Sequence, residues 1–171
     1  MGFIEMKPKE LEASNVFKMI GKEWFLICAE SGGVRNAMTA SWGFLGEIWN
    51  TPCALCVVRP QRFTHTLTEA SDRASLCFFG DGYRTELSLF GTKSGRDTDK
   101  AAECNFHYEE CDGVPYFREA KIALICTKLY ADEFREDGFI AKDVLERCYP
   151  ERDLHTVYIY RIDHCLVKSE D

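Results

Sequence analysis

The sequence is short of positive charge and of long apolar runs. It holds 21 Lys and Arg residues against 28 Asp and Glu residues, which gives a net charge of −7. A general nucleic-acid-binding protein usually presents a basic field, so this balance argues against nucleic acid as a partner. The longest apolar runs, such as Trp24 to Ala29, are far shorter than the roughly 20 residues that cross a bilayer. We therefore expect no membrane partner.

Several sequence signals are also absent. Charged residues interrupt the first ten positions, where a secretory signal would need an apolar core, so we expect a cytoplasmic location. No internal repeat, low-complexity stretch or linker divides the chain, and residues 1–171 are predicted to form one domain. The dinucleotide-binding fingerprint is lacking, because Gly80 and Gly82 are followed by Thr85 where a third Gly would stand.

Cysteine, in contrast, is abundant, with nine residues spread along the chain. The number is odd, and without an export signal reduced thiols are expected rather than a disulfide framework. Most lie inside apolar runs, where Cys acts as a small hydrophobic residue. Cys53 and Cys56 fall on opposite faces of a predicted strand, which disfavours both a redox pair and half of a metal site.

Apolar patterning and turn residues predict several strands with a few short helices. A turn is expected at 31–33 and a connection over 46–52, and Asp97 is expected to cap the helix that it begins. The predicted helices span 9–22, 63–70, 85–90, 97–103 and 139–147, and the predicted strands span 24–29, 37–44, 53–59, 75–79, 119–130 and 155–167.

Three polar motifs interrupt this apolar pattern. The first runs Asn36-x-Met38-Thr39-Ala40-Ser41-Trp42-Gly43, and the second runs Val58-Arg59-Pro60-x-Arg62-x-Thr64. Hydroxyls, backbone amides and planar guanidinium groups suit a phosphate, and a large aromatic side chain packs against a flat ring. The polar edge of a solvated β-hairpin would show the same residues. Ser41 and Trp42 point to opposite faces of a straight strand, so a bend is needed for both to reach one ligand.

The third motif is Gly91-Thr92-Lys93-Ser94-Gly95-Arg96-Asp97-x-Asp99-Lys100. Ser94-Gly95 before a helix start is typical of an anion site, and Gly95 permits close approach of the backbone. Arg96 and Lys100 would share a face if this segment were helical. A capped helix with a solvated basic face is the alternative.

In order and spacing, the three motifs resemble the flavin reductase-like family of FMN-binding split barrels, to which flavoredoxins belong. The resemblance extends from Asn15 to the final strand and so covers nearly the whole chain. It implies a mainly β fold, an antiparallel Greek-key split barrel with a few short helices. It also implies a homodimer with FMN near the subunit boundary.

The activity implied by the resemblance is electron transfer from NAD(P)H through FMN to a flavin, a metal chelate or a redox protein. Lys100 or Arg96 would supply a cation that favours the reduced flavin, and no catalytic residue is assigned. The FMN-binding residues that it implies are Asn36, Met38, Thr39, Ala40, Ser41, Trp42, Arg59, Arg62, Thr64, Ser94, Gly95, Arg96 and Lys100.

Other functions remain open from the sequence. One is a non-enzymatic FMN electron carrier reduced by a partner protein, and another is a ligand-sensing module such as a haem protein with His107 or His155 as axial ligand. Cys104, His107 and Cys111 would lie on one side of a helix, but no second pair of ligands stands near them, so no metal is expected. His155 and His164 are candidate proton donors, although a solvated or hydrogen-bonded structural role is more common for such residues.

Overall fold

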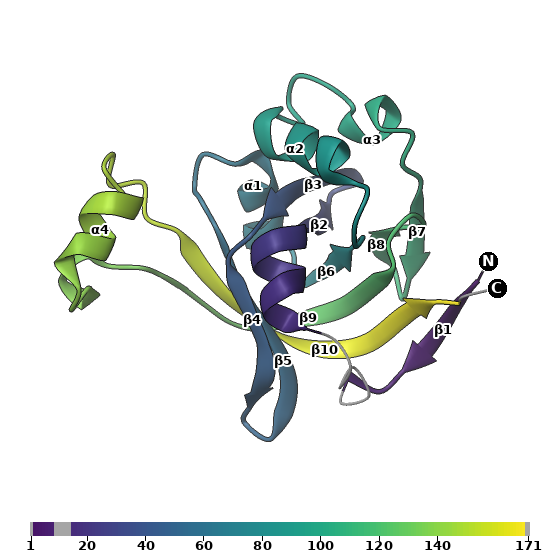
Figure 1. The fold of residues 1–171 in the computed structure, drawn as a ribbon, viewed down its shortest axis with the longest axis horizontal. Coiled ribbons are helices and arrows are strands. Elements are labelled where there is room, and N and C mark those ends of the chain that lie inside the picture. Colours follow the sequence, from purple (N-terminus) through teal and green to yellow (C-terminus); the bar gives the residue numbers. More distant parts are fainter. Residues whose placement is uncertain (1, 9–14, 170–171) are drawn as a thin grey trace.

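The computed structural model describes residues 2–8 and 15–169, and Figure 1 shows a curved sheet with helices packed around it. The main sheet is antiparallel and 8-stranded, with the strand order β3-β2-β6-β9-β10-β5-β4, and β1 pairs with β10 outside this path. A second sheet is the hairpin β7-β8. The strands are β1 (Phe3–Met6), β2 (Phe25–Ser31), β3 (Val34–Ala40), β4 (Gly43–Ile48), β5 (Thr51–Val58), β6 (Arg73–Phe78), β7 (Tyr108–Cys111), β8 (Val114–Phe117), β9 (Ile122–Glu133) and β10 (Thr156–Lys168).

The helices are short and lie at the ends and on one face of the sheet (Figure 1). No helix in the described part of the chain has the length and apolar character needed to span a membrane. The described helices are η2 (Lys18–Glu23), α1 (Phe63–Ala70), α2 (Arg84–Thr92), α3 (Lys100–Glu103), η3 (Glu136–Gly138) and α4 (Lys142–Cys148). The prediction of a mainly antiparallel β fold with a few short helices is confirmed.

Two apolar clusters lie on opposite faces of the central strands. In β2, Phe25 and Ile27 enter one cluster, while Leu26 and Cys28 enter the other. Successive strand residues point to opposite faces, so a strand that is covered on both sides reads as a continuous apolar run. α2 and the β7-β8 hairpin contribute Leu87 and other residues to the second cluster, and thereby cover the outer face.

The link between β3 and β4 makes the sheet curl. β3 and β4 stand at the two ends of the strand order, yet only Ser41 and Trp42 separate them in the chain. Two residues span only about 7 Å, so the far edges of the sheet have to come together at this point. The single strand predicted over 37–44 is therefore wrong, and the bend that a shared ligand required lies at Ser41-Trp42.

The connection predicted over 46–52 is also wrong, because β4 and β5 form a tight hairpin there. Glu47 pairs with Pro52 and Ile48 with Thr51, so the loop is only Trp49 and Asn50. Both loop residues have φ of +55°, as in the hairpin turn whose twist matches the strands. Asn tolerates this conformation but Trp rarely adopts it, so the pair Trp49-Asn50 does not predict a turn.

The segment after α2 departs from the predicted helix over 97–103. Only Lys100–Glu103 is helical, and the cap is Asp99, whose carboxylate accepts a hydrogen bond from the Ala102 amide at 3.1 Å. Arg96 and Lys100 therefore do not share a helix face. Cys111 lies in β7 rather than on a helix with Cys104 and His107, and the turn Asp112-Gly113 has positive φ at both residues. Residues 9–14 of the first predicted helix lie outside the described residues, and its later part is the π-helical η2.

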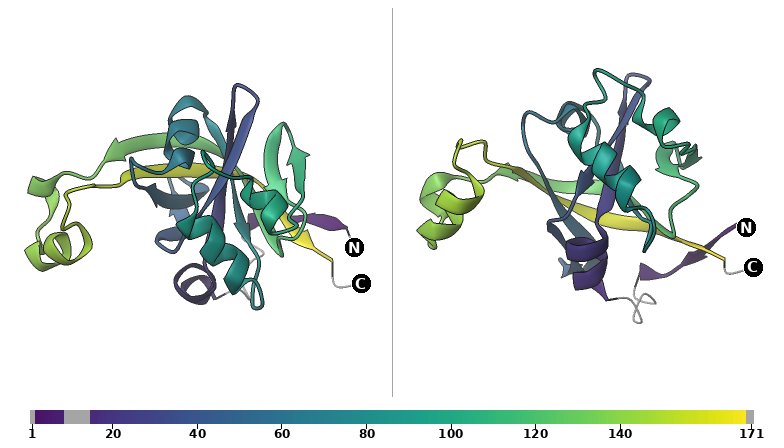
Figure 2. Two further views of the ribbon diagram at one scale, coloured as in Figure 1. Left: turned by 90° about the horizontal axis from the view of Figure 1, so that it is seen from above. Right: turned by 45° about the horizontal axis from the view of Figure 1, so that its top comes forward.

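β9 and β10 extend beyond the body of the sheet and carry α4 at their tip. Figures 1 and 2 show this arm standing away from the rest of the molecule. Its base is attached by Arg59, which forms an ion pair with Asp153 and donates a hydrogen bond of 3.0 Å to the Cys148 carbonyl. The arm is thus anchored beside the end of β5 but leaves its tip exposed.

Gly43 begins β4 where a side chain has no room. A Cβ at this position would lie 2.4 Å from the Leu55 carbonyl oxygen, whereas a Cβ at Gly46 in the same strand would meet no atom within 4 Å. We predict that Gly43→Ala forces β4 away from β5 and lowers the free energy of unfolding by about 1–3 kcal/mol. Urea unfolding measures this loss, and Gly46→Ala is the matched control. Equal midpoints for the two variants would contradict the tight packing at Gly43.

Candidate functional site

A cavity opens where the end of β3 meets the end of β5. Its wall is formed by residues from the Met38–Trp42 segment, from β5 and from the loop after it, together with His155. The break between β3 and β4 lets consecutive residues face this space, which no straight strand allows. The lining residues are Met38, Thr39, Ala40, Ser41, Trp42, Val57, Arg59, Arg62 and His155.

A second cavity adjoins the first and shares Met38 and Arg62 with it. It lies between β3, the start of α1 and the loop after α2. The cavities measure about 230 and 120 Å³, which together reach the lower end of the range for small-molecule sites. We call the two cavities together the groove. The second is lined by Asn36, Met38, Gln61, Arg62, Phe63, Thr64, Thr92, Lys93, Ser94, Gly95 and Lys100.

Asn36 and Gly95 bring the three motifs into contact. The Asn36 amide donates a hydrogen bond of 2.8 Å to the Thr64 hydroxyl, which joins β3 to α1. A Cβ on Gly95 would lie 2.1 Å from Asn36 Oδ1, so only glycine lets the loop backbone approach this closely. In the same loop the Ser94 hydroxyl accepts a hydrogen bond of 3.2 Å from the Arg96 amide.

Two cations stand at the wall of the groove, and carbonyl groups hold them. Lys100 is 3% exposed and donates a hydrogen bond of 2.6 Å to the Ala37 carbonyl. Arg62 donates to the carbonyls of Gly91 at 2.7 Å and Phe90 at 3.0 Å, near the C-terminal end of α2. Neither cation forms an ion pair with a carboxylate of the described residues.

The electrostatics follow from this arrangement. Burial and, to a smaller extent, the positive charge of Arg62 lower the pKa of Lys100 to about 8. Burial also lowers the pKa of Arg62. Two neighbouring cations that are partly removed from water and lack an acidic partner are costly, and an anion placed between them relieves that cost. The groove is therefore suited to a negatively charged ligand.

Arg59, Arg96 and Thr39 are occupied in other ways. Arg59 lines the first cavity but faces the arm, with its guanidinium 5.2 Å from the Tyr149 ring centroid. Arg96 lies 4.9 Å from the centroid of Phe63 and lines a neighbouring pocket with Asn36, Gly95 and Lys100. The Thr39 hydroxyl donates to the Leu87 carbonyl of α2. All thirteen predicted residues thus line the groove or the pocket beside it. Their shared position does not identify the ligand, so FMN binding by these residues stays a prediction.

His155 completes the first cavity and was not among the predicted binding residues. The β5-β10 register pairs Thr156 with Val58, so His155 follows on beside Arg59. The ring centroids of Trp42 and His155 are 5.2 Å apart, and the Tyr149 hydroxyl lies 2.8 Å from His155 Nδ1. Only the strand register, which the sequence does not reveal, brings His155 here.

Val57, Gln61, Phe63, Thr92 and Lys93 are further lining residues that the prediction omitted. Four of them lie inside the second and third motifs, so including every residue of each motif would have found them. Val57 lies in β5 directly before the second motif, and only the position of the cavity identifies it.

Comparison with protein families gives one match, in which the model of the flavin reductase like domain covers residues 18–171. Comparison with curated proteins gives no match. The family match spans all three motifs and every residue that lines the groove.

Solved structures share the fold at low sequence identity. An FMN-binding protein from Thermus thermophilus has a TM-score of 0.68 at 21% identity, with 86% of this chain and 72% of that chain covered. A flavoredoxin from Methanosarcina acetivorans has a TM-score of 0.70 at 17% identity, with 86% and 69% covered. The styrene monooxygenase flavin reductase from Pseudomonas putida S12 has a TM-score of 0.65 at 16% identity, with 87% and 81% covered.

The burial of His155 generates a prediction on acid stability. Burial and the neighbouring Arg59 charge lower the pKa of His155 to about 4 from its ordinary 6.5, so the folded protein holds this ring neutral. Between these pH values the unfolded chain binds the proton more readily, and folding loses up to about 1.4 kcal/mol per pH unit as pH falls. We predict that His155→Gln loses less stability than the wild type between pH 6.5 and 4.5.

Chemical denaturation at several pH values measures the difference between the two proteins. Because carboxylates titrate equally in both, the difference isolates residue 155. Parallel stability curves would contradict a neutral His155 in the folded state.

Proposed function

The chain belongs to the flavin reductase-like family, and from this premise we propose that it binds FMN in the groove and acts as an oxidoreductase. In this proposal electrons pass from NADH or NADPH through FMN to a flavin, a metal chelate or a redox protein. Similar structures include FMN-binding proteins, flavoredoxins and flavin reductases, which supports a flavin as the ligand.

The single observation that carries the proposal is the pair Lys100 and Arg62. Both are partly or fully buried, both rest on carbonyl oxygens, and among the described residues neither has a carboxylate partner. A phosphate group supplies the missing negative charge with geometry that suits a guanidinium. Arg62, Thr64 and the Ser94-Gly95 loop would hold it in the second cavity.

The first cavity suits the ring of the same ligand. Met38, Ala40 and Val57 give it an apolar wall, and the indole of Trp42 stands at its mouth with 44% of the residue exposed. An aromatic edge and apolar side chains bind a flat ring through dispersion and apolar burial. Bound FMN supplies the hydride- and electron-accepting chemistry, and the chain supplies binding, orientation and charge.

Lys100 and Arg62 also influence the redox balance. Arg62 lines both cavities and Lys100 lines the second, and their positive charge stabilises negative charge that develops on a ligand in the groove. Lys100, with a pKa of about 8, is mostly charged at neutral pH and is therefore effective there. The nicotinamide donor docks without a dinucleotide-binding motif, on the open side of the first cavity.

A second candidate function is an FMN electron carrier that a partner protein reduces. Flavoredoxins from Methanosarcina acetivorans and Desulfovibrio vulgaris are among the similar structures, with TM-scores of 0.70 and 0.68. The two functions share the groove and differ in the electron donor. Reduction by a nicotinamide separates them.

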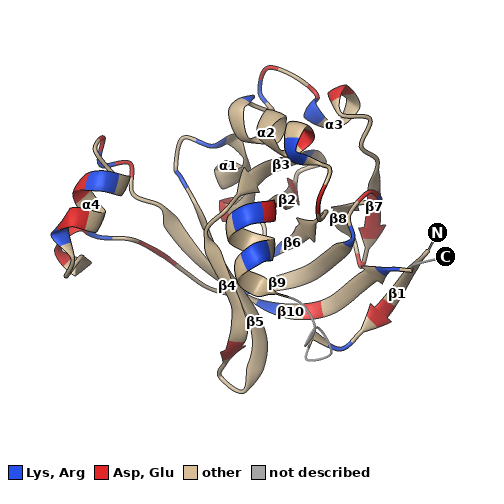
Figure 3. Cartoon of the chain, in the orientation of Figure 1, with Lys and Arg blue, Asp and Glu red and all other residues tan. Residues whose placement is uncertain are grey.

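We also propose a homodimer, formed through the arm and the β4-β5 hairpin. The hairpin has Glu47 as its only charged residue, and Figure 3 shows it as an almost uncharged element. Phe44 and Trp49 are 69% and 57% exposed there, and Ile140 near the arm tip is 94% exposed. An exposed apolar surface together with a projecting arm is typical of an interface between chains.

The enzymatic proposal predicts that NADH or NADPH bleaches FMN on the reconstituted protein under anaerobic conditions. Lys100→Met removes the buried charge at similar length, so we expect slower bleaching or weaker FMN retention. Cys104→Ala is the control, because this half-buried thiol does not line the groove. Stopped-flow absorbance measures the rate. If dithionite bleaches bound FMN while neither nicotinamide does, the carrier function replaces the enzymatic one.

The dimer proposal predicts that the wild type sediments as a dimer at micromolar concentration and that Trp49→Glu shifts it toward monomer. A charge on the apolar hairpin has no partner to offset its desolvation in an interface. Phe17→Glu, at an aromatic residue that is 92% exposed outside both segments, serves as control. A monomeric wild type, or equal dissociation of both variants, would contradict an interface at the hairpin.

A further inference from the structure

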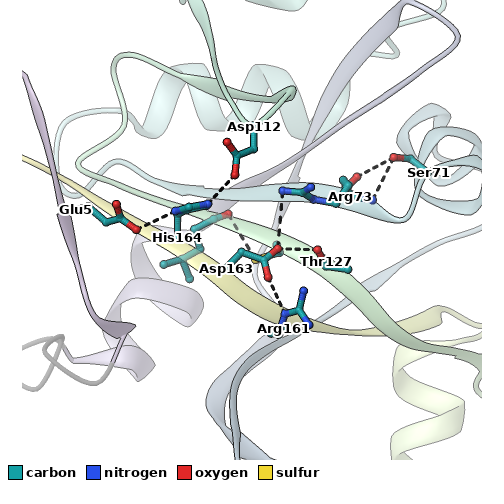
Figure 4. Close-up of polar contacts among 10 residues, drawn as sticks. Glu5, Ser71, Arg73, Asp112, Thr127, Arg161, Asp163 and His164 are labelled. Atoms are coloured by element: carbon teal, nitrogen blue, oxygen red, sulfur yellow. Dashed lines mark hydrogen bonds and ion pairs between the residues drawn. The ribbon is translucent and has the colours of Figure 1, made fainter.

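A cluster of metal-ligating side chains lies away from the groove, where β1, the β7-β8 hairpin and β10 meet. Cys111 ends β7, Asp112 opens the hairpin turn, and His164 lies in β10. The potential ligand atoms of these three residues all lie within 4.8 Å of one another. Figure 4 shows His164 between the carboxylates of Asp112 and Glu5.

Local backbone features aim these side chains at one point. The register between β9 and β10 shifts between Ile162 and His164, and such irregularities re-aim the side chains that follow. Glu5 pairs with Leu166, so its side chain lies on the same face as His164. Asp112 occupies a turn position with φ of +50°, which places its carboxylate over β10.

Each nitrogen of His164 has a defined neighbour. Asp112 Oδ2 lies 2.8 Å from Nε2, and Glu5 Oε1 lies 2.8 Å from Nδ1. A ligating histidine commonly donates its other ring N–H to a carboxylate, which fixes the orientation of the ring. Glu5 is in that position, and Asp112 stands at the other ring nitrogen, where a metal ion would bind. The Cys111 sulfur lies within 4.8 Å of the potential ligand atoms of Asp112 and His164.

We propose that Cys111, Asp112 and His164 bind a zinc-class divalent cation, with Glu5 holding the Nδ1–H of His164. A thiolate, an imidazole and a carboxylate match the ligands that Zn²⁺ takes, and water completes a tetrahedral site. The thiol gives its proton to solvent when the metal binds. The hard cations Mg²⁺ and Ca²⁺ prefer oxygen ligands and are not expected here.

The surrounding charges are compatible with a cation. Glu5 and Asp112 contribute negative charge, and the thiolate adds to it. The positive charge of Arg73 is turned toward Asp163, with Nη2 of Arg73 3.8 Å from the Asp163 carboxylate (Figure 4). A metal ion here would join β10 to the β7-β8 hairpin, with β1 attached through Glu5, and would act as a structural link.

An imidazolium held between two carboxylates is the simpler description of His164, and it accounts for Glu5 and Asp112. This ion pair involves no atom of Cys111, although the Cys111 sulfur also lies within 4.8 Å of the potential ligand atoms of Asp112 and His164. The thiol therefore distinguishes the metal site from the ion-pair clamp.

The test is zinc binding by the full-length chain after dialysis against a chelator, measured by competition with a chromogenic chelator. We expect one Zn²⁺ per chain, no binding of Mg²⁺, and a loss of affinity of about tenfold or more for Glu5→Gln. Cys111→Ser and His164→Gln should lose more. Cys104→Ser and His107→Gln are matched controls, since Cys104 is also half-buried and His107 Nδ1 also lies 2.8 Å from a carboxylate, that of Glu119.

Cobalt gives a second readout that does not depend on variant stability. Co²⁺ bound to the wild type should show a thiolate charge-transfer band that Cys111→Ser lacks and Cys104→Ser keeps. Zinc should also raise the melting temperature of the wild type but not that of Cys111→Ser. Absence of zinc binding in the wild type, or equal binding by the Cys111 and Cys104 variants, would overturn the proposal and leave the ion-pair clamp.

Discussion

The two-residue link Ser41-Trp42 is the constraint on which the rest of the structure depends. It joins the two strands at opposite ends of the main sheet, so the sheet has to curl until the end of β3 lies beside β5. Curling encloses one apolar cluster and leaves the other face for α2 and the β7-β8 hairpin to cover. The same break turns Met38–Trp42 toward one cavity, so the feature that closes the fold also builds the site.

The partly or fully buried positive charges of Lys100 and Arg62 make the groove suitable for binding an anion. Lys100 and Arg62 are costly to bury, and the carbonyls of Ala37, Phe90 and Gly91 offset only part of the cost. Because neither cation has an acidic partner among residues 2–8 and 15–169, the groove retains an attraction for an anion. In a member of the flavin reductase-like family, the phosphate of FMN is the anion that we propose. The metal site that we propose at Cys111, Asp112 and His164 is separate from the groove and lies at the turn of the β7-β8 hairpin.

Part of the fold and of the candidate site could be predicted from the sequence. The physical reasons why a prediction was right or wrong differ between elements. α1 spans Phe63–Ala70, the predicted bounds, and it begins three residues after Pro60, which cannot donate a hydrogen bond to a continuing strand. The three motifs were predicted to lie together, and the structure brings Asn36, Thr64 and Gly95 into contact. The turn at Trp49 was missed because no glycine marks it. His155, Glu5 and His164 owe their positions to strand register, which depends on pairing between distant segments and leaves no local signal.

The most direct test of the central claim is a fluorescence titration of flavin-free protein with FMN and with riboflavin, which differ only by the phosphate. If Arg62 and Lys100 form an anion site, FMN should bind about tenfold more tightly or better, because a charge-assisted hydrogen bond contributes about 1.5–3 kcal/mol. The preference should shrink in Arg62→Gln and persist in Arg84→Gln, whose side chain lies over Trp24. Equal affinity of the wild type for the two flavins would contradict the claim that the groove binds FMN through its phosphate.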